Sequence, residues 1–186
     1  MIYWFTGQPG HGKTTLALAL VKQLRRQGYA PFHIDGDDLR KLTTNQDYSR
    51  QGREANIRRA QNIAQYLHAQ EEIVVVSFVS PYREIREELK AVTKVTEIYV
   101  HTKEVRGKED RHVKDFEAPL SRFIDIDTTN KKVPDCVSHI LESAPVPSKE
   151  LKTLDKRKTL AVDFDGVIHR YSKGFQGLEN AYDPPM

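Results

Sequence analysis

Several residue types and patterns are rare in or absent from this sequence, and this scarcity excludes whole classes of protein. It contains 1 cysteine, Cys136, which excludes an internal disulfide framework and a site built from several thiolates. Its 7 histidines show no spacing typical of metal ligands. No apolar run approaches the roughly 20 residues that span a bilayer, and the first residues lack a signal-peptide pattern. We therefore expect a cytoplasmic protein without membrane contact.

The excess of charge of one sign is also small. The 29 Lys and Arg residues against 26 Asp and Glu give a net charge of +3, and the isoelectric point is near 8.9. Such an excess suits an anionic ligand but is weak support for nucleic-acid binding. With 38% hydrophobic and 30% charged residues, the 186-residue chain is expected to form one globular core with a small appendage.

Glycine is scarce, at 10 residues, yet three glycines gather in segment 7–14, whose sequence is GQPGHGKT. This is the pattern of a phosphate-binding loop for nucleoside triphosphates, and it lies between a strand-like run at 2–5 and a helical run at 16–26. The glycines let the backbone curl around phosphates where a Cβ would crowd the oxygens or forbid the backbone dihedral angles, and the helix N-terminus favours the phosphate charge. Lys13 adds a point charge, and the Thr14 hydroxyl can hold Mg²⁺. The predicted ATP-binding residues are Gly7, Gly10, His11 (expected to be exposed), Gly12, Lys13, Thr14 and Thr15.

Beyond the loop, apolar strand-like runs alternate with amphipathic helical patterns. Run 73–78 is apolar and rich in valine, as in a central parallel strand that is buried on both faces. This alternation predicts an α/β fold, a parallel sheet with helices on both faces and ligands at the carboxyl ends of the strands. The expected strands are 2–5, 30–34, 73–78, 97–100 and 123–126, and the expected helices are 16–26, 53–70, 82–92 and 133–141.

Asp35, Asp37 and Asp38 follow the second expected strand and so should lie near the phosphate loop. Phosphoryl transfer needs Mg²⁺ on the phosphate oxygens and a group that orients or deprotonates the attacking hydroxyl. Asp35 and Asp37 can divide these tasks, because the third strand is followed by Ser77 and Ser80 instead of a carboxylate. The alternative is an aspartate-rich turn in which Asp38 caps a following helix.

The order of these motifs resembles the adenylylsulfate kinase family. The resemblance extends to about Pro119 and rests on the phosphate loop, DGDDLR at 35–40, Tyr48-Ser49, REANIRRA at 53–60 and SFVSPYR at 77–83. It implies a P-loop kinase that uses Mg-ATP to phosphorylate the 3′-hydroxyl of adenosine 5′-phosphosulfate, a small nucleotide.

The resemblance also implies roles for individual residues. It implies that one residue of the Asp35/Asp37 pair is the catalytic aspartate, and we favour Asp37. It also implies that Lys13 is a catalytic residue that contacts the ATP phosphates. Arginines pair with phosphate or sulfate oxygens, and an aromatic face accepts a purine. The residues implied to bind the acceptor are Arg40, Tyr48 (for a phenylalanine of the family), Arg53, Asn56 and Val79 (for an isoleucine).

One segment departs from the family pattern. The family has a long basic lid after its fourth strand, and here the corresponding stretch, 102–119, is shorter. Arg106 and Arg111 could reach the transferring phosphoryl group, and we count Arg106 among the catalytic residues. The shorter lid leaves the acceptor less certain than the reaction, because this segment helps to enclose the adenosine.

The end of the chain carries a second motif. After a proline-rich stretch at 144–148, a strand-like run leads into DFDGVI at 163–168, which resembles the first motif of haloacid-dehalogenase-type phosphatases. Asp163 would attack phosphate and Asp165 would act as acid and base. That fold needs further groups well over a hundred residues downstream, so we expect an incomplete domain here. We therefore divide the chain into a kinase domain at 1–145, a linker at 146–158 and a phosphatase-like start at 159–186.

Two other functions compete with adenylylsulfate kinase. A phosphate-loop kinase followed by such a phosphatase is the layout of polynucleotide kinase-phosphatases, so the acceptor could be a nucleic-acid 5′-hydroxyl, with Asp35 or Asp37 as base and Arg40 as phosphate clamp. A regulatory module that binds ATP without transferring phosphate is the third hypothesis, against which the intact Lys13, Thr14 and aspartate pair argue. The sequence leaves the oligomeric state open.

Overall fold

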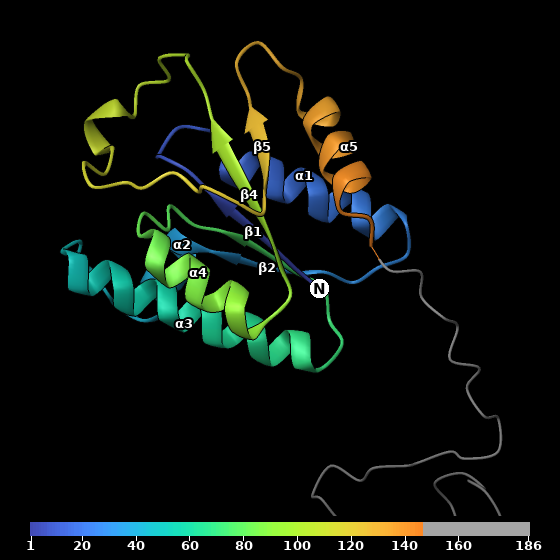
Figure 1. Ribbon diagram of the computed structural model, residues 1–186, viewed down its shortest axis with the longest axis horizontal. Coiled ribbons are helices and arrows are strands. Elements are labelled where there is room, and N and C mark those ends of the chain that lie inside the picture. The colour runs from blue at the N-terminus through green and yellow to red at the C-terminus, as the bar shows by residue number, and fades with distance from the viewer. Residues whose placement is uncertain (147–186) are drawn as a thin grey trace, which may run out of the picture. The chain divides into compact units, whose positions relative to one another are not determined.

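The computed structural model of the chain describes residues 1–146 (Figure 1). The predicted linker, apart from its first residue, and the phosphatase-like motif with Asp163 and Asp165 lie outside the described residues. The division of the chain into a kinase domain, a linker and a phosphatase-like start therefore stays a prediction.

Five parallel strands form a single sheet in the order β2-β3-β1-β4-β5. The central strand β1 places Tyr3 beside Val75 of β3 and Thr96 of β4, and every residue of β1 is buried. Such burial on both faces is typical of parallel sheets and explains the apolar runs in the sequence. The strands are β1 (Ile2–Thr6), β2 (Phe32–Asp35), β3 (Val74–Ser77), β4 (Val95–His101) and β5 (Phe123–Asp127).

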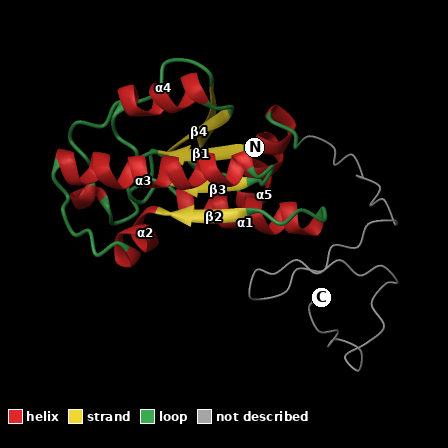
Figure 2. Ribbon diagram, turned by 90° about the horizontal axis from the view of Figure 1, so that it is seen from below, coloured by secondary structure: helices red, strands yellow, loops and turns green. Residues whose placement is uncertain are grey.

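Helices cover both faces of this sheet (Figure 2). On one face, α1 (Lys13–Arg26) and α5 (Val133–Ser143) pack on a core that includes Tyr3 and Phe5. On the other face, α3 (Arg50–Ala69) and α4 (Arg83–Val92) pack on a core that includes Ile2 and Trp4. Neighbouring residues of β1 thus serve opposite cores, as the two-residue period of a strand requires. The predicted α/β fold is confirmed.

The structure also contains two short elements that the sequence analysis did not predict. These are α2 (Gly36–Leu42) and a 3₁₀ turn, η1 (Glu109–Arg111). In α2 only Leu39 is buried, so this helix has no repeating apolar pattern to detect. Two expected helix starts were also late: α1 begins at Lys13 and α3 at Arg50, because their first turns carry polar residues.

Parallel strands bring several loops to one edge of the sheet. The phosphate loop follows β1, α2 follows β2, residues 78–82 follow β3, and the lid segment 102–119 follows β4. The carboxyl edge of a doubly covered sheet is where such folds bind ligands. Within residues 1–146, no helix is long and apolar enough to cross a membrane.

Candidate active site

The phosphate loop depends on glycine at three positions, for different reasons. Gly7, Gly10 and Gly12 have φ values of 145°, 85° and 95°, a region that L side chains rarely adopt. At Gly7 a Cβ would lie 2.1 Å from the carbonyl oxygen of Val100. Gly7 is therefore needed for its backbone conformation and for the close approach of β4. Gly12 is the N-cap of α1, so it places the helix N-terminus at the loop.

Lys13 opens α1 with its side chain almost fully buried, at 9% exposure. Its Nζ donates to the carbonyl oxygen of Gln8 at 2.8 Å. Burial lowers the pKa of Lys13 to about 8, although Asp35 and Asp37 act in the opposite direction. An arriving phosphate would restore the preference for the charged form, because opposite charges nearby raise a lysine pKa.

Asp35 is a hydrogen-bonding centre at the end of β2. Its Oδ2 accepts from Thr14 Oγ1 at 2.9 Å and from Ser77 Oγ at 2.7 Å, and its Oδ1 accepts from the backbone N of Asp37 at 2.9 Å. Partial burial acts to raise the pKa of Asp35, but these hydrogen bonds outweigh it and hold the pKa below its usual value. Behind Ser77, a ring nitrogen of His33 lies 3.0 Å from its Oγ.

The helix that follows is capped by Asp35, which accepts from Asp37 N. The alternative with Asp38 as the cap was therefore wrong; Asp38 pairs instead with Lys41 on the surface. Thr14 and Asp35 present a hydroxyl and a carboxylate within hydrogen-bonding distance of each other. Hard oxygen ligands of this kind fit Mg²⁺, which commonly takes one or two protein ligands and fills the rest with water and phosphate oxygens. Among residues 1–146 no cluster of three or more His, Cys, Asp or Glu side chains suits a metal.

These groups line a cleft of about 1200 Å³. This volume exceeds the roughly 300–1,000 Å³ of a typical single-ligand pocket, so the cleft has room for two nucleotides. Its walls include nearly all of the predicted site residues: Gly10, Gly12, Lys13, Thr14, Thr15, Asp35, Asp37, Arg40, Tyr48, Arg53, Asn56, Val79 and Arg106.

One end of the cleft carries an aromatic ring flanked by two arginines. Tyr48 is 61% exposed, and the guanidinium carbon atoms of Arg40 and Arg53 lie 4.4 Å and 5.8 Å from its ring centroid. Arg40 Nη1 donates to the carbonyl oxygen of Asp47 at 2.8 Å, and Arg53 Nε donates to that of Tyr48 at 2.7 Å. Backbone bonds thus fix both cations while guanidinium nitrogens stay available to an anion.

Asn56 of α3 lies in the same wall and is only 2% exposed. Its Nδ2 donates to the carbonyl oxygen of Gly36 at 3.4 Å, whereas its Oδ1 is buried with no hydrogen-bond partner among the described residues. A buried hydrogen-bond acceptor that has no donor lowers the stability of the fold. Such an atom needs an explanation, and a bound ligand that donates a hydrogen bond to Asn56 Oδ1 would supply one.

The lid places basic side chains against the phosphate loop. Arg106 Nη1 lies 3.5 Å from the carbonyl oxygen of Gly10, and its Nε and Nη2 donate to Glu104. A Cβ at Gly10 would lie 3.2 Å from Cβ of Lys108. Cationic groups of the lid therefore adjoin the mouth of the loop, where negative phosphates would gather.

His11 departs from its prediction. It is half-buried instead of exposed, and its Nδ1 lies 3.2 Å from the carbonyl oxygen of Val100. Its ring meets that of His112 edge-on, with centroids 5.3 Å apart. Neither Gly7 nor His11 is among the residues that line the cleft, so the His11 side chain faces β4 and the lid instead.

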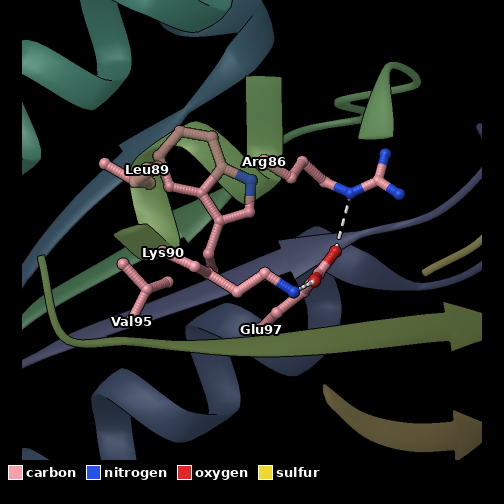
Figure 3. Close-up of a pocket in the computed structure, with 6 residues that line it drawn as sticks. Arg86, Leu89, Lys90, Val95 and Glu97 are labelled. Atoms are coloured by element: carbon pink, nitrogen blue, oxygen red, sulfur yellow. Dashed lines mark hydrogen bonds and ion pairs between the residues drawn. The ribbon is translucent and has the colours of Figure 1, made fainter. Parts of the chain in front are cut away.

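A buried ion network lies behind the cleft and was missed by the sequence analysis. Arg86 and Lys90 of α4 approach opposite carboxylate oxygens of Glu97 on β4, at 2.7 Å and 2.6 Å, with exposures of 2–4% for the three side chains (Figure 3). The cavity beside them holds only about 10 Å³, too little for more than one water molecule. This cluster is therefore structural. Sequence periodicity offers no signal for it, since charged residues on a helix are usually exposed.

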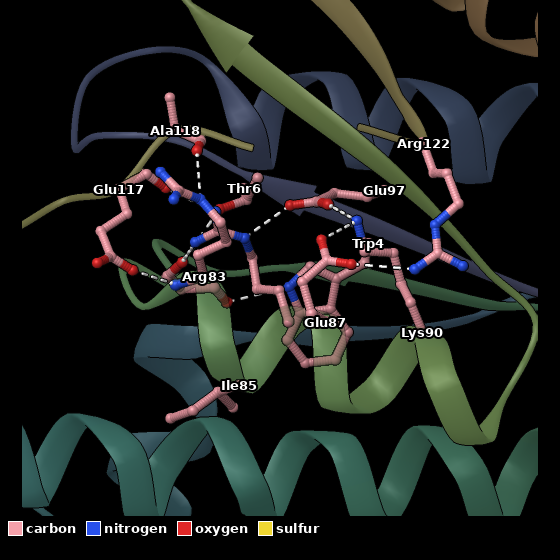
Figure 4. A network of polar contacts seen from close by, with 12 residues as sticks. Trp4, Thr6, Arg83, Ile85, Glu87, Lys90, Glu97, Glu117, Ala118 and Arg122 are labelled. Carbon is pink, nitrogen blue, oxygen red and sulfur yellow. Dashed lines mark hydrogen bonds and ion pairs between the residues drawn. The ribbon is translucent and has the colours of Figure 1, made fainter. Parts of the chain in front are cut away.

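The network also fixes two backbone segments that border the cleft (Figure 4). Arg86 donates to the carbonyl oxygens of Ser80, after β3, and of Glu117, at the end of the lid. Arg83 Nε donates to the carbonyl oxygen of Ala118 at 3.0 Å. The wall that carries Val79 and the far end of the lid are thus held by the same helix.

Comparisons with known proteins agree with this geometry. Residues 1–119 match the family described as Adenylylsulphate kinase. The Adenylyl-sulfate kinase of Chloroflexus aurantiacus is 35% identical over 161 residues, which cover 76% of this chain and 87% of the relative. That of Staphylococcus carnosus is 31% identical, with 76% of this chain and 82% of the relative covered. In fold, the chain resembles the Mycobacterium tuberculosis APS kinase solved with AMPPNP and APS, with a TM-score of 0.67, 21% identity, and coverage of 76% and 95%.

Proposed function

The chain belongs to the adenylylsulphate kinase family, and we propose on this premise that it transfers the γ-phosphoryl group of ATP to the 3′-hydroxyl of adenylyl sulfate. One observation carries the proposal. On one side of the segment Asp35–Asp37, the Asp35 carboxylate accepts a hydrogen bond from Thr14 of the phosphate loop. On the other side, the carbonyl oxygen of Gly36 accepts one from Asn56, which lines the part of the cleft near Tyr48. Candidate catalytic carboxylates thus join the two parts of a single cleft.

ATP is proposed to bind with its phosphates in the phosphate loop. Lys13 and the backbone N–H groups at the start of α1 supply positive potential there. Arg106 adds a cation from the lid that would stabilise charge on the migrating phosphoryl group. Thr14 and Asp35 would hold Mg²⁺, which supplies charge neutralisation on the β- and γ-phosphates.

The two aspartates are proposed to act differently. Asp35 already accepts three hydrogen bonds, so its carboxylate is oriented, weakly basic and suited to the metal side. Asp37 lines the cleft from the first turn of α2. We assign to Asp37 the task of orienting the acceptor hydroxyl and taking its proton as the new P–O bond forms.

Adenylyl sulfate is proposed to occupy the end of the cleft that contains Tyr48. The Tyr48 ring would accept the adenine face, and Arg40 and Arg53 would pair with oxygens of the phosphosulfate group. The Oδ1 atom of Asn56 would accept a hydrogen bond from the nucleotide, which would satisfy the orphaned acceptor. Val79 adds an apolar wall.

The direct test is label transfer from γ-labelled Mg-ATP, with adenylyl sulfate in one reaction and a 5′-hydroxyl oligonucleotide in another. Label on adenylyl sulfate, lost in Lys13→Ala, is the expected result. Label on the oligonucleotide alone would replace the proposed acceptor by a nucleic-acid end. ATP binding without label on either acceptor would favour a regulatory nucleotide-binding module.

A further inference from the structure

The lid is attached to the rest of the molecule at several points, and two of these attachments differ in character. Its far end is held by Arg86, which is 3% exposed and belongs to the buried network of α4 and β4. Its centre is held by a side chain of the phosphate loop itself. The proposed function assigns no role to that second attachment, and the following inference rests on that function.

The second attachment is a reciprocal pair between Gln8 and the backbone of Val113. Gln8 Nε2 donates to the carbonyl oxygen of Val113 at 2.8 Å, and Val113 N donates to Gln8 Oε1 at 2.9 Å. The two residues are 105 positions apart in the sequence. Val113 is 6% exposed, whereas residues 106–111 before it are exposed. Within residues 106–115, Val113 is therefore the residue that is buried against the rest of the protein.

The neighbouring contacts make Gln8 the centre of this attachment. A ring nitrogen of His112 lies 3.0 Å from the carbonyl oxygen of Pro9. The carbonyl oxygen of Gln8 accepts from Lys13 Nζ at 2.8 Å. Gln8 thus contacts the lid through its side chain and the phosphate-binding lysine through its main chain.

We propose that Gln8 is a positioning residue that latches the lid over the phosphate loop and thereby keeps water from the γ-phosphate. The Gln8 carboxamide has both a donor and an acceptor, so it pairs with the C=O and the N–H of one residue at the same time. With the latch released, a water oxygen would attack the γ-phosphorus in place of the acceptor hydroxyl. The bond from the γ-phosphorus to the bridging oxygen would break, and ADP, inorganic phosphate and a proton would be released.

Variants of Gln8 can remove both of its hydrogen bonds to Val113 or only one of them. Gln8→Leu keeps the approximate size and removes both bonds. Gln8→Glu keeps the acceptor for Val113 N and places an oxygen against the Val113 carbonyl. Gln27→Leu, at an exposed position after α1, is the matched control for the substitution itself.

The first measurement is limited trypsin digestion of the full chain without ligands, with cleavage after Lys108, Arg111 and Lys114 followed by mass spectrometry. We expect cleavage at these sites to be about tenfold faster in Gln8→Leu than in the parent and in Gln27→Leu. Equal rates in all three proteins would overturn the latch. This readout does not depend on the acceptor, so it separates a failed latch from a failed function.

The second measurement is the amount of ADP formed per phosphorylated adenylyl sulfate. We expect this ratio to rise several-fold in Gln8→Leu and Gln8→Glu, with little change in the KM for ATP. A merely structural defect would lower both products together and leave the ratio unchanged, which would refute the role in excluding water. If Gln8→Leu does not fold, as judged by its melting temperature, Gln8→Glu decides both measurements.

Discussion

Asp35 and Asp37 are two residues apart and differ in what their carboxylates can still do. The oxygens of Asp35 accept from Thr14, Ser77 and the Asp37 backbone, and the pKa of Asp35 is lowered by these bonds. A carboxylate held in this way is a poor proton acceptor but a well-oriented metal ligand. The division of tasks that we propose for the two aspartates rests on this difference in hydrogen bonding.

We therefore predict different kinetic defects for the two isosteric variants. Asp37→Asn should lower kcat by about 10²- to 10⁴-fold with little effect on either KM, because it removes the proton acceptor. Asp35→Asn should instead raise the Mg²⁺ concentration for half-maximal rate by about tenfold or more. Steady-state kinetics over a magnesium titration distinguishes them. The opposite pattern, with kcat loss confined to Asp35→Asn, would reverse the assignment.

Lys13 provides a pH-dependent prediction at the same scale. Its pKa is lowered by burial to about 8, so the free protein has Lys13 charged below pH 7 and partly neutral at pH 8. Binding of ATP raises this pKa again. We expect uptake of about half a proton per ATP at pH 8 and almost none from Lys13 at pH 6.5. Calorimetry in buffers of different ionisation enthalpy measures the uptake, and Lys13→Met should abolish it; uptake that persists in this variant would contradict the assignment to Lys13.

At the scale of elements, α4 and β4 are joined by charges that are buried instead of exposed. Glu97 is 2% exposed and forms ion pairs with both Arg86 and Lys90, and Lys90 also pairs with Glu87. A buried pair is costly to break, because one partner is left as an uncompensated charge. The backbone of Ser80 and Glu117 depends on Arg86, so damage here should reach the substrate cleft.

We predict that Glu97→Gln lowers the free energy of unfolding by about 3–5 kcal/mol. The matched control is Glu88→Gln on α4, the helix that carries Arg86 and Lys90, since the Arg58–Glu88 pair is 52% and 47% exposed and should contribute less than about 1 kcal/mol. Urea denaturation of both variants gives the comparison. Equal effects would show that burial does not strengthen the Glu97 pairs.

The same scale shows how far the sequence could predict the elements. Strand and helix order followed from apolar runs and periodicity, because both faces of the sheet are covered. The helix α2 was not among the expected helices, since Leu39 is its only buried residue and one apolar residue gives no periodic pattern. The loop glycines were found, but the close contact of Gly7 with Val100 depends on a strand that is distant in the sequence.

At the scale of the whole molecule, one compact unit spans Met1–Pro147. It contains two cores, one on each face of the sheet, and the cleft with all of its lining among the described residues. The kinase reaction should therefore depend on this unit by itself.

We predict that a chain ending at residue 146 keeps the full rate of phosphoryl transfer and melts within a few degrees of the 186-residue protein. The two cores and the cleft are formed by residues within 1–146 as far as the structure describes them, so we expect no apolar surface of either core to be newly exposed. Thermal unfolding and label transfer, measured side by side, provide the check. A large loss of either would place part of the kinase domain beyond residue 146.

The sequence by itself determined the family of this protein and the order of its strands and helices, because the phosphate loop, the aspartate pair and the apolar runs are local patterns with specific spacing. The tertiary structure decided how these groups are held. Ser77 reaches Asp35 across 42 positions, Arg86 reaches Glu117 across 31, and Gln8 reaches Val113 across 105. The physical reason is that a hydrogen bond between distant segments depends on how strands and loops meet in space. Local periodicity and motif spacing contain no information about which distant segments lie side by side in the fold.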